Sequence, residues 1–221
     1  MNLSAFYTHN SPGFEPIFHT ALEKSKWEPA NVKSYKARMY QMVQALLFTD
    51  NLAGATAEAG CLYGTSSYII LSYSRDTHYI YDSMQGLSKP NNLDYNELSK
   101  EKMDRLSKKT KRNNFLTRVE DTLSDFKHFM IGVGWIPDCF NKQRHDFFRF
   151  VHIDVDLYEP TYESIKHFYP RLIKGGVIVC DDYGFKSWPG AKAGIDAYCK
   201  PRGIPVISTV AGNAIIIKME D

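Results

Sequence analysis

Two short apolar runs that each end in carboxylates constrain the fold of this chain most strongly. VHIDVDLY begins at Val151, GGVIVCDDYG ends at Gly184, and a span of helical character lies between them. A strand, a helix and a strand in this order form the crossover unit of a parallel sheet that is covered on both faces. Because parallel strands end at one edge, we expect Asp154, Asp181 and Asp182 to meet at a rim where open α/β sheets bind ligands.

The rest of the chain continues this alternation. Strands are expected at 53–59, 77–83, 130–135, 147–154, 177–181, 205–209 and 214–218, and helices at 35–49, after the turn at 60–64, and at 117–129, 137–142, 161–173 and 190–199. The last two strands are joined by the tight VAGN turn, which is too short for a crossover and indicates an antiparallel pair. The sequence therefore predicts a Rossmann-like α/β fold with a mostly parallel sheet.

The length of 221 residues and the 43% hydrophobic content favour one domain over residues 1–221. Residues 1–34 mix proline, glycine and aromatic residues without a clear period, so we expect an irregular N-terminal arm. Residues 84–113 form a polar insertion, with a helix expected from Tyr95 onward, and its place beside the rim predicts a lid. The arm and the helix after it offer apolar surface that a second copy of the chain could cover, as in a homo-oligomer.

Composition excludes several classes of protein. With 27 basic and 25 acidic residues the net charge is +2, so neither nucleic acid nor an anionic membrane is expected as the main partner. The four cysteines show no CxxC spacing, which argues against a zinc site or a disulfide framework. The N-terminus lacks the pattern of a signal peptide and no apolar run could span a bilayer. We therefore expect a cytoplasmic protein whose partner is a small-molecule or glycan acceptor.

The turn after the first strand indicates a nucleoside that carries an amino acid. Gly60 and Gly64 allow the backbone to approach a ligand, but they do not form the GxGxxG pattern of dinucleotide-binding proteins. Asp82, about twenty residues further on at a strand end, is placed to bind ribose hydroxyls. Glu58 adds a carboxylate that suits an amino group better than a phosphate. Together these residues favour S-adenosylmethionine over a dinucleotide.

The three aspartates at the later strand ends indicate a metal site. Converging carboxylates repel one another and raise one another's pKa unless a cation neutralises them, and oxygen ligands suit magnesium, manganese or calcium. Such a metal could lower the pKa of an acceptor hydroxyl. Alternatively, Asp181 and Asp182 are helix caps or turn formers ahead of Tyr183. His152 shares a strand face with Asp154 and is interpreted as a packed residue.

Four motifs, in order, carry a resemblance to a known family. AEAGCLYGTSS, YDSMQGLSKP, VGWIPDCF and FVHIDVDLYEPTYESIKHFYPRLIKGGVIVCDDYG resemble the macrocin O-methyltransferase (TylF-type) family of bacterial sugar O-methyltransferases, over roughly residues 54–199. The resemblance implies the seven-stranded class I methyltransferase sheet, with an antiparallel final strand. It also implies S-adenosylmethionine as methyl donor and Mg²⁺ in support of attack by a sugar hydroxyl.

The resemblance also implies roles for matched positions. Asp154 would be the general base and a metal ligand beside the donor, with Asp181 and Asp182 as further ligands. The first turn would hold the methionine end of the donor, the second strand end its ribose, and the next strand end its adenine. In that order the residues are Glu58, Gly60, Tyr63, Gly64 and Ser66, then Asp82 and Ser83, then Gly134 and Trp135.

The chain departs from the family pattern in its first turn. That turn has Leu62-Tyr63-Gly64-Thr65 where the family carries tryptophan, arginine and two glycines. At Leu157, catechol-type relatives carry a lysine, so a lysine base is disfavoured. Three alternatives stay open. They are methylation of a catechol-like phenol, a Rossmann-type nucleotide-binding protein without methyl transfer, and a metal-stabilised binding module.

Overall fold

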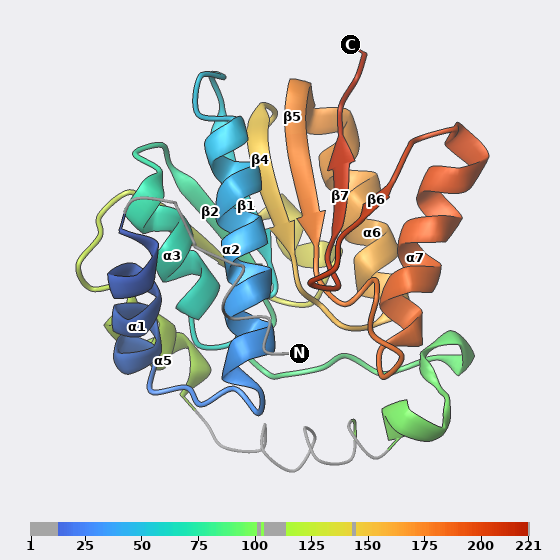
Figure 1. The fold of residues 1–221 in the computed structure, drawn as a ribbon, viewed down its shortest axis with the longest axis horizontal. Coiled ribbons are helices and arrows are strands. Elements are labelled where there is room, and N and C mark those ends of the chain that lie inside the picture. Colours follow the sequence, from blue (N-terminus) through green and yellow to red (C-terminus); the bar gives the residue numbers. More distant parts are fainter. Residues whose placement is uncertain (1–12, 101–102, 104–113, 143–144, 221) are drawn as a thin grey trace, which may run out of the picture.

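The computed structural model describes residues 13–100, 103, 114–142 and 145–220 and contains a seven-stranded sheet (Figure 1). The strand order is β3-β2-β1-β4-β5-β7-β6. The strands are β1 (Ala55–Ala59), β2 (His78–Asp82), β3 (Phe129–Val133), β4 (Phe148–Ile153), β5 (Leu172–Cys180), β6 (Ile207–Ser208) and β7 (Ala214–Ile217). The first five are parallel, whereas β7 runs antiparallel to both β5 and β6. This topology confirms the predicted fold class and the antiparallel final pair.

Helices cover both faces of the sheet (Figure 1). They are α1 (Phe14–Ser25), α2 (Val32–Phe48), α3 (Thr65–Tyr73), α5 (Phe115–Thr122), α6 (Tyr158–Phe168) and α7 (Pro189–Cys199), with single turns η2 (Asn92–Asp94), η3 (Asp138–Asn141), η4 (Tyr169–Arg171) and η5 (Lys200–Arg202). Alternate residues of the central strands serve the two cores. On β5, Val177 and Val179 pack with α1, α2 and α3, whereas Ile178 packs with α6 and α7. Burial on both faces explains why these strands read as continuous apolar runs.

The predicted irregular arm at 1–34 is wrong for residues 14–25, which form α1. Phe14, Phe18 and Ala21 are buried and recur at helical spacing. Pro16 lies in the first helical turn, where a missing backbone N–H costs little. The prolines therefore concealed a regular amphipathic helix. Residues 1–12 lie outside the described part of the chain.

Several helix ends, and the start of the strand expected at 177–181, differ from their predicted positions. The helix expected at 117–129 ends at Thr122, and the one expected at 161–173 gives way to β5 at Leu172. Pro170 in the turn between α6 and β5 cannot donate the hydrogen bond that a continuing helix needs.

Where the insertion 84–113 is described, it contains η2 and a helical stretch at 97–100, near the start expected at Tyr95. Its remainder lies outside the described residues, and its role as a lid stays a prediction, as does the single domain.

Within the described residues, no helix combines the length and the apolar character needed to cross a bilayer.

Candidate active site

A cavity of about 500 Å³ opens at the carboxyl ends of the central strands. This size is typical of small-molecule sites, and the position is where open α/β sheets bind ligands. Seven of the residues singled out from the sequence line it: Gly60, Ser66, Asp82, Ser83, Trp135, Asp154 and Asp182. Two of the three aspartates expected at the rim, Asp154 and Asp182, line this crevice, and α2 supplies another part of its wall through Tyr35 and Arg38.

Gly60 brings the first turn against the loop that carries Asp154. Its φ is +83°, and an added Cβ would lie 2.1 Å from the backbone oxygen of Asp154. The Asp154 N–H donates to Ala59 O at 2.9 Å, and the Gly60 N–H donates to Tyr81 O at 2.8 Å. Only glycine fits here, because a side chain would collide with backbone in a conformation that L-residues avoid.

Asp82 organises the same turn through its carboxylate. Oδ2 accepts the backbone N–H groups of Cys61 and Leu62 at 2.8 and 3.2 Å, and Oδ1 accepts that of Met84 at 2.7 Å. Desolvation raises the pKa of Asp82, although the three amides counteract this effect. Four lone-pair positions on a carboxylate leave room for a further donor on Oδ1. Asp82 thus shapes the turn and still offers an acceptor to the cavity.

Five residues singled out from the sequence do not line the cavity: Glu58, Tyr63, Gly64, Gly134 and Asp181. The ring of Tyr63 stacks on Phe115, at 5.4 Å between centroids, with the Arg118 guanidinium 3.5 Å above it. Gly64 caps α3, and the Gly134 N–H donates to Asp82 O. Tyr63 and Gly134 thus contact residues that line the cavity, Phe115 and Asp82.

Glu58 is fully buried and engaged by protein groups. Ser67 Oγ donates a short hydrogen bond to Oε2, and His152 Nδ1 lies 2.7 Å from Oε1. Burial raises the pKa of Glu58, but the contacts with His152 and His78 outweigh it and lower the pKa to about 2. A carboxylate committed to these partners is poorly placed to bind a ligand, so the sequence argument for an amino-group contact does not carry over.

His152 lies between two acids rather than in an apolar core. Its Nε2 is 3.5 Å from Asp181 Oδ1, on the side opposite Glu58. Burial lowers the pKa of His152, but Asp181 and Glu58 together raise it to about 10. The two flanking acids thus favour the protonated form of the ring, and the simple packing interpretation of this residue is incomplete.

Asp181 and Asp182 fall in different groups of potential ligands. Ligand atoms of Asp154, Asp156 and Asp182 all lie within 4.8 Å of one another, and a second group joins His152, Asp154 and Asp181. Desolvation raises the pKa of Asp154 to about 7, with Asp181 and Asp156 adding to the effect. Burial also raises the pKa of Asp182 well above its usual value, with Asp156 and Asp154 adding to it. Closely spaced acids with raised pKa values are a donor set that a hard divalent cation fits.

The charge of Asp181 is compensated by side chains from two other segments of the chain. Arg38 Nη1 donates to its Oδ2 at 2.7 Å, and Asn213 Nδ2 donates a short hydrogen bond to its Oδ1. Burial raises the pKa of Asp181, but Arg38, His152 and Asn213 outweigh it and lower the pKa. The Arg38 guanidinium also lies 3.7 Å from Asp182 and packs over the Phe185 ring.

Comparison with known proteins identifies the family to which this architecture belongs. The model of the macrocin-O-methyltransferase (TylF) family matches residues 30–214. The chain belongs to this family. Demethyldecarbamoylnovobiocin O-methyltransferase from Streptomyces niveus is 27% identical over 161 residues, which are 67% of this chain and 59% of that protein. This chain thus spans about three fifths of the length of that relative.

Solved structures of similar proteins share the fold. The O-methyltransferase NovP superposes with a TM-score of 0.68 at 19% identity, covering 89% of this chain and 86% of its own. CalS11, described as a TDP-rhamnose 3'-O-methyltransferase of calicheamicin biosynthesis, gives 0.56 at 14%, covering 98% and 99%. Both likenesses concern the fold.

Two residues at the site of this TylF-family chain, one acidic and one basic, were not singled out from its sequence. Asp156 stands two positions after Asp154, a spacing that could have drawn attention to it. Arg38 lies on a helix 143 residues before its partner Asp181, and no local pattern marks it. Asp156 and Asp182 both have positive φ, +61° and +66°, a costly conformation that is concentrated at functional sites.

Proposed function

We propose that this protein transfers a methyl group from S-adenosylmethionine to a sugar hydroxyl. One observation carries this proposal: the glycine turn with Asp82 and the group of Asp154, Asp156 and Asp182 open into the same cavity. Family membership supports methyl transfer as the reaction. A similar structure described as acting on TDP-rhamnose supports a sugar as the acceptor.

The donor is expected along the ends of β1 and β2. Gly60 lines the cavity where the methionine portion would lie, and Asp82 offers Oδ1 to a ribose hydroxyl beside Ser83. Trp135 is partly exposed and lines the cavity beyond Asp82, where it can cover the adenine ring. Because Glu58 and Tyr63 are engaged elsewhere, they would act on the donor only through the turn.

The acceptor is expected between Asp154 and the α2 wall. In this geometry the hydroxyl oxygen forms a bond to the methyl carbon as the carbon–sulfur bond breaks, giving a methyl ether and S-adenosylhomocysteine. Asp154, which lines the cavity, is the proposed base that takes the hydroxyl proton. Holding the two reactants in line supplies much of the rate enhancement.

We further propose Mg²⁺ as the physiological cation. Asp154 and Asp182 would hold it, with Asp156 as third ligand by proximity, or Asp181 if Arg38 releases it. When bound, the cation would supply a positive charge that lowers the pKa of the acceptor hydroxyl. Around it, Arg38 and His152 keep Asp181 ionised and fixed in place.

Calorimetric titration with S-adenosylmethionine and S-adenosylhomocysteine tests the donor assignment. We expect binding of both, and loss of binding in Asp82→Ala, which removes the ribose acceptor. Methylation of sugar-bearing compounds compared with catechol-like phenols then tests the acceptor class. Heat with NAD but none with S-adenosylmethionine would instead favour the Rossmann-type nucleotide-binding alternative, and metal binding without donor binding would favour a binding module.

The choice of base is tested by Asp154→Asn. We expect turnover to fall by roughly 100-fold or more, in line with the loss of a general base, while S-adenosylhomocysteine still binds. Retention of the full rate would show that another residue takes the proton, and Asp156→Asn would then be the next variant.

A further inference from the structure

The segment 91–96 of the insertion, called the strut below, contacts both loops that carry the acids. Asp94 within η2 is only 1% exposed. Its Oδ1 accepts the backbone N–H of Tyr158 at 2.7 Å, and its Oδ2 accepts that of Asn91 at 2.8 Å. Tyr158 is the first residue of α6, whose own N-cap, Leu157, provides no side-chain cap. A carboxylate from a distant segment therefore caps α6, immediately after the loop of Asp154 and Asp156.

Gly190 provides the space for this contact. It lies in the first turn of α7, and an added Cβ would be 1.8 Å from Asp94 Oδ1 and 2.7 Å from Tyr158 N. No side chain fits between these atoms, so α7, the strut and the start of α6 meet at one point. The position of Asp94 is thus fixed by two helices as well as by its own turn.

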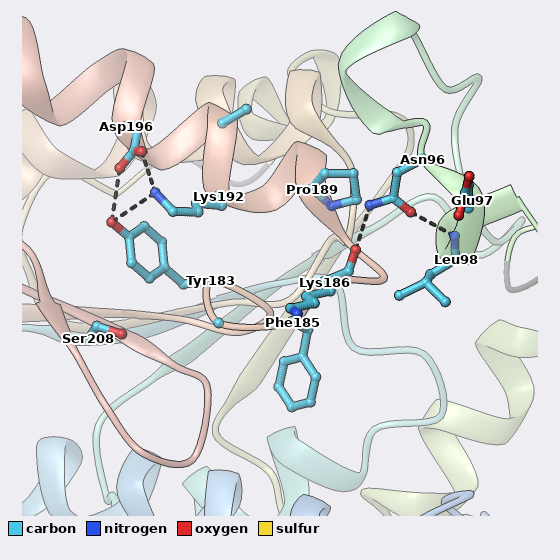
Figure 2. A pocket seen from close by; sticks show the side chains of 12 residues that line it. Asn96, Glu97, Leu98, Tyr183, Phe185, Lys186, Pro189, Lys192, Asp196 and Ser208 are labelled. Carbon is cyan, nitrogen blue, oxygen red and sulfur yellow. Dashed lines mark hydrogen bonds and ion pairs between the residues drawn. The ribbon is translucent and has the colours of Figure 1, made fainter.

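Asn96 makes the second contact, with the loop after Asp182. Its Nδ2 donates to Lys186 O at 2.6 Å, while its Oδ1 accepts the backbone N–H groups of Leu98 and Ser99. Figure 2 shows this amide reaching across to Lys186, beside Pro189, in the wall of a second cavity of about 780 Å³. The strut thus contacts the end of the loop that carries Asp156 through Asp94, and the loop after Asp182 through Asn96.

Both loops need such support because their backbones are strained. Asp156 has φ +61° at the centre of a three-residue turn closed by the Leu157 N–H and Val155 O at 2.6 Å. Asp182 has φ +66°. Such conformations persist only where surrounding contacts over-determine them. Next to the strut, Leu157 and Trp188 pack together in a small apolar cluster, which joins the two loops a second time.

We propose that the strut sets the distance between the two acid-bearing loops, and that Asp94 and Asn96 are positioning residues for the proposed cation site. The inference rests on the proposed function, since it concerns the site formed by Asp154, Asp156 and Asp182. Neither Asp94 nor Asn96 lines the cavity of the candidate active site. Partners that orient metal ligands typically change metal affinity or activity by roughly 10- to 100-fold when they are altered.

The test compares Asp94→Asn with Glu97→Gln, which makes the same change of charge three residues away at a position outside the contacts described. Mn²⁺ binding is measured by calorimetry with donor product present, and the kcat and KM for S-adenosylmethionine are measured alongside. In Asp94→Asn we expect Mn²⁺ to bind at least roughly 10-fold more weakly, with a lower kcat and an unchanged KM for the donor. Glu97→Gln should match the wild type.

Gly190→Ala provides an independent second variant, because it displaces Asp94 without altering it. Amide hydrogen exchange should show faster exchange at Tyr158 in both variants, which verifies that the cap is lost. Wild-type Mn²⁺ affinity and kcat in both folded variants, despite faster exchange, would overturn the positioning role alone. Absence of Mn²⁺ binding by the wild-type protein would overturn the metal part of the proposed function as well, so the two failures are distinguishable.

Discussion

Arg38 brings a positive charge to a rim that is crowded with carboxylates. Its Nη1 lies 2.7 Å from Asp181 and 3.7 Å from Asp182. Because these groups are largely removed from water, the attraction is stronger than that of a surface pair, and so is the cost of leaving one partner alone. The free energy of unfolding should therefore depend on the same charged side chains that surround the candidate site.

Replacing Arg38 by Met should destabilise the protein substantially. Asp181 would lose the Arg38 guanidinium while remaining buried, and removing one partner of a buried ion pair typically costs about 3 kcal/mol or more. Denaturant unfolding at pH 7 measures the change, with Lys33→Met as the control, since Lys33 is exposed on the same helix. Equal stability of the two variants would contradict the structural role given to Arg38.

Because the flanking acids raise the pKa of the buried His152 ring, the stability of the protein should depend on pH in the alkaline range. Its folded pKa of about 10 exceeds the ordinary value of 6.5. The unfolded chain therefore loses this proton first, and between these values it binds fewer protons than the folded state. The facing groups are Glu58 and Asp181, with His78 beyond Glu58. The contribution that the contacts of the protonated ring with these acids make to the stability of the fold is complete below pH 6.5 and is lost as pH rises towards 10.

The free energy of unfolding should accordingly fall from pH 6.5 to 10, by at most about 1.4 kcal/mol per pH unit for one proton. His152→Gln should remove most of this slope. His19→Gln, on the exposed side of α1, should retain it. An unchanged slope in His152→Gln would mean that the ring is neutral in the folded protein.

At the scale of elements, close backbone approach joins β1 to β4. The turn after β1 passes Asp154 so closely that Gly60 has no room for a side chain. One residue therefore couples the donor side of the cavity to the acid side. Loss of the close contact between Gly60 and the Asp154 backbone should disturb both sides of the cavity.

Gly60→Ala should be far more damaging than another glycine substitution with the same backbone cost. Gly203 also has positive φ, +63°, but nothing lies within 4 Å of an added Cβ. Gly203→Ala should cost only the backbone term, about 1–2 kcal/mol, whereas Gly60→Ala adds a collision with Asp154 O. Unfolding experiments and S-adenosylhomocysteine calorimetry on both variants measure the difference. Equal effects would show that the approach is not required.

At the scale of the whole molecule, a cation at the acids should stabilise the native fold. A ligand that binds only the folded state at 100 times its Kd adds about 2.7 kcal/mol to the free energy of unfolding. We expect Mg²⁺ or Mn²⁺ to raise the unfolding midpoint, a chelator to reverse the rise, and Asp182→Asn to abolish it. A midpoint that responds equally in wild type and Asp182→Asn would place the cation elsewhere.

Short-range patterns sufficed to predict the architecture. Apolar runs ending in acids, separated by helical spans, indicated the parallel sheet, and the short VAGN turn indicated the antiparallel pair at its end. The same patterns placed Gly60, Asp82, Asp154 and Asp182 at one crevice. These features were accessible because strand direction and chain order together determine which residues share an edge of a sheet.

What the tertiary structure alone decided is which groups compensate one another. The chain order does not reveal that Glu58 is engaged by His152, that Asp181 is bound by Arg38, or that Asp94 caps α6. Each pairing joins segments far apart in the sequence, and each replaces water around a buried charge. The sequence by itself therefore determined where the acids gather, whereas packing decided which side chains pair with them, because a buried charge is costly unless a partner compensates it.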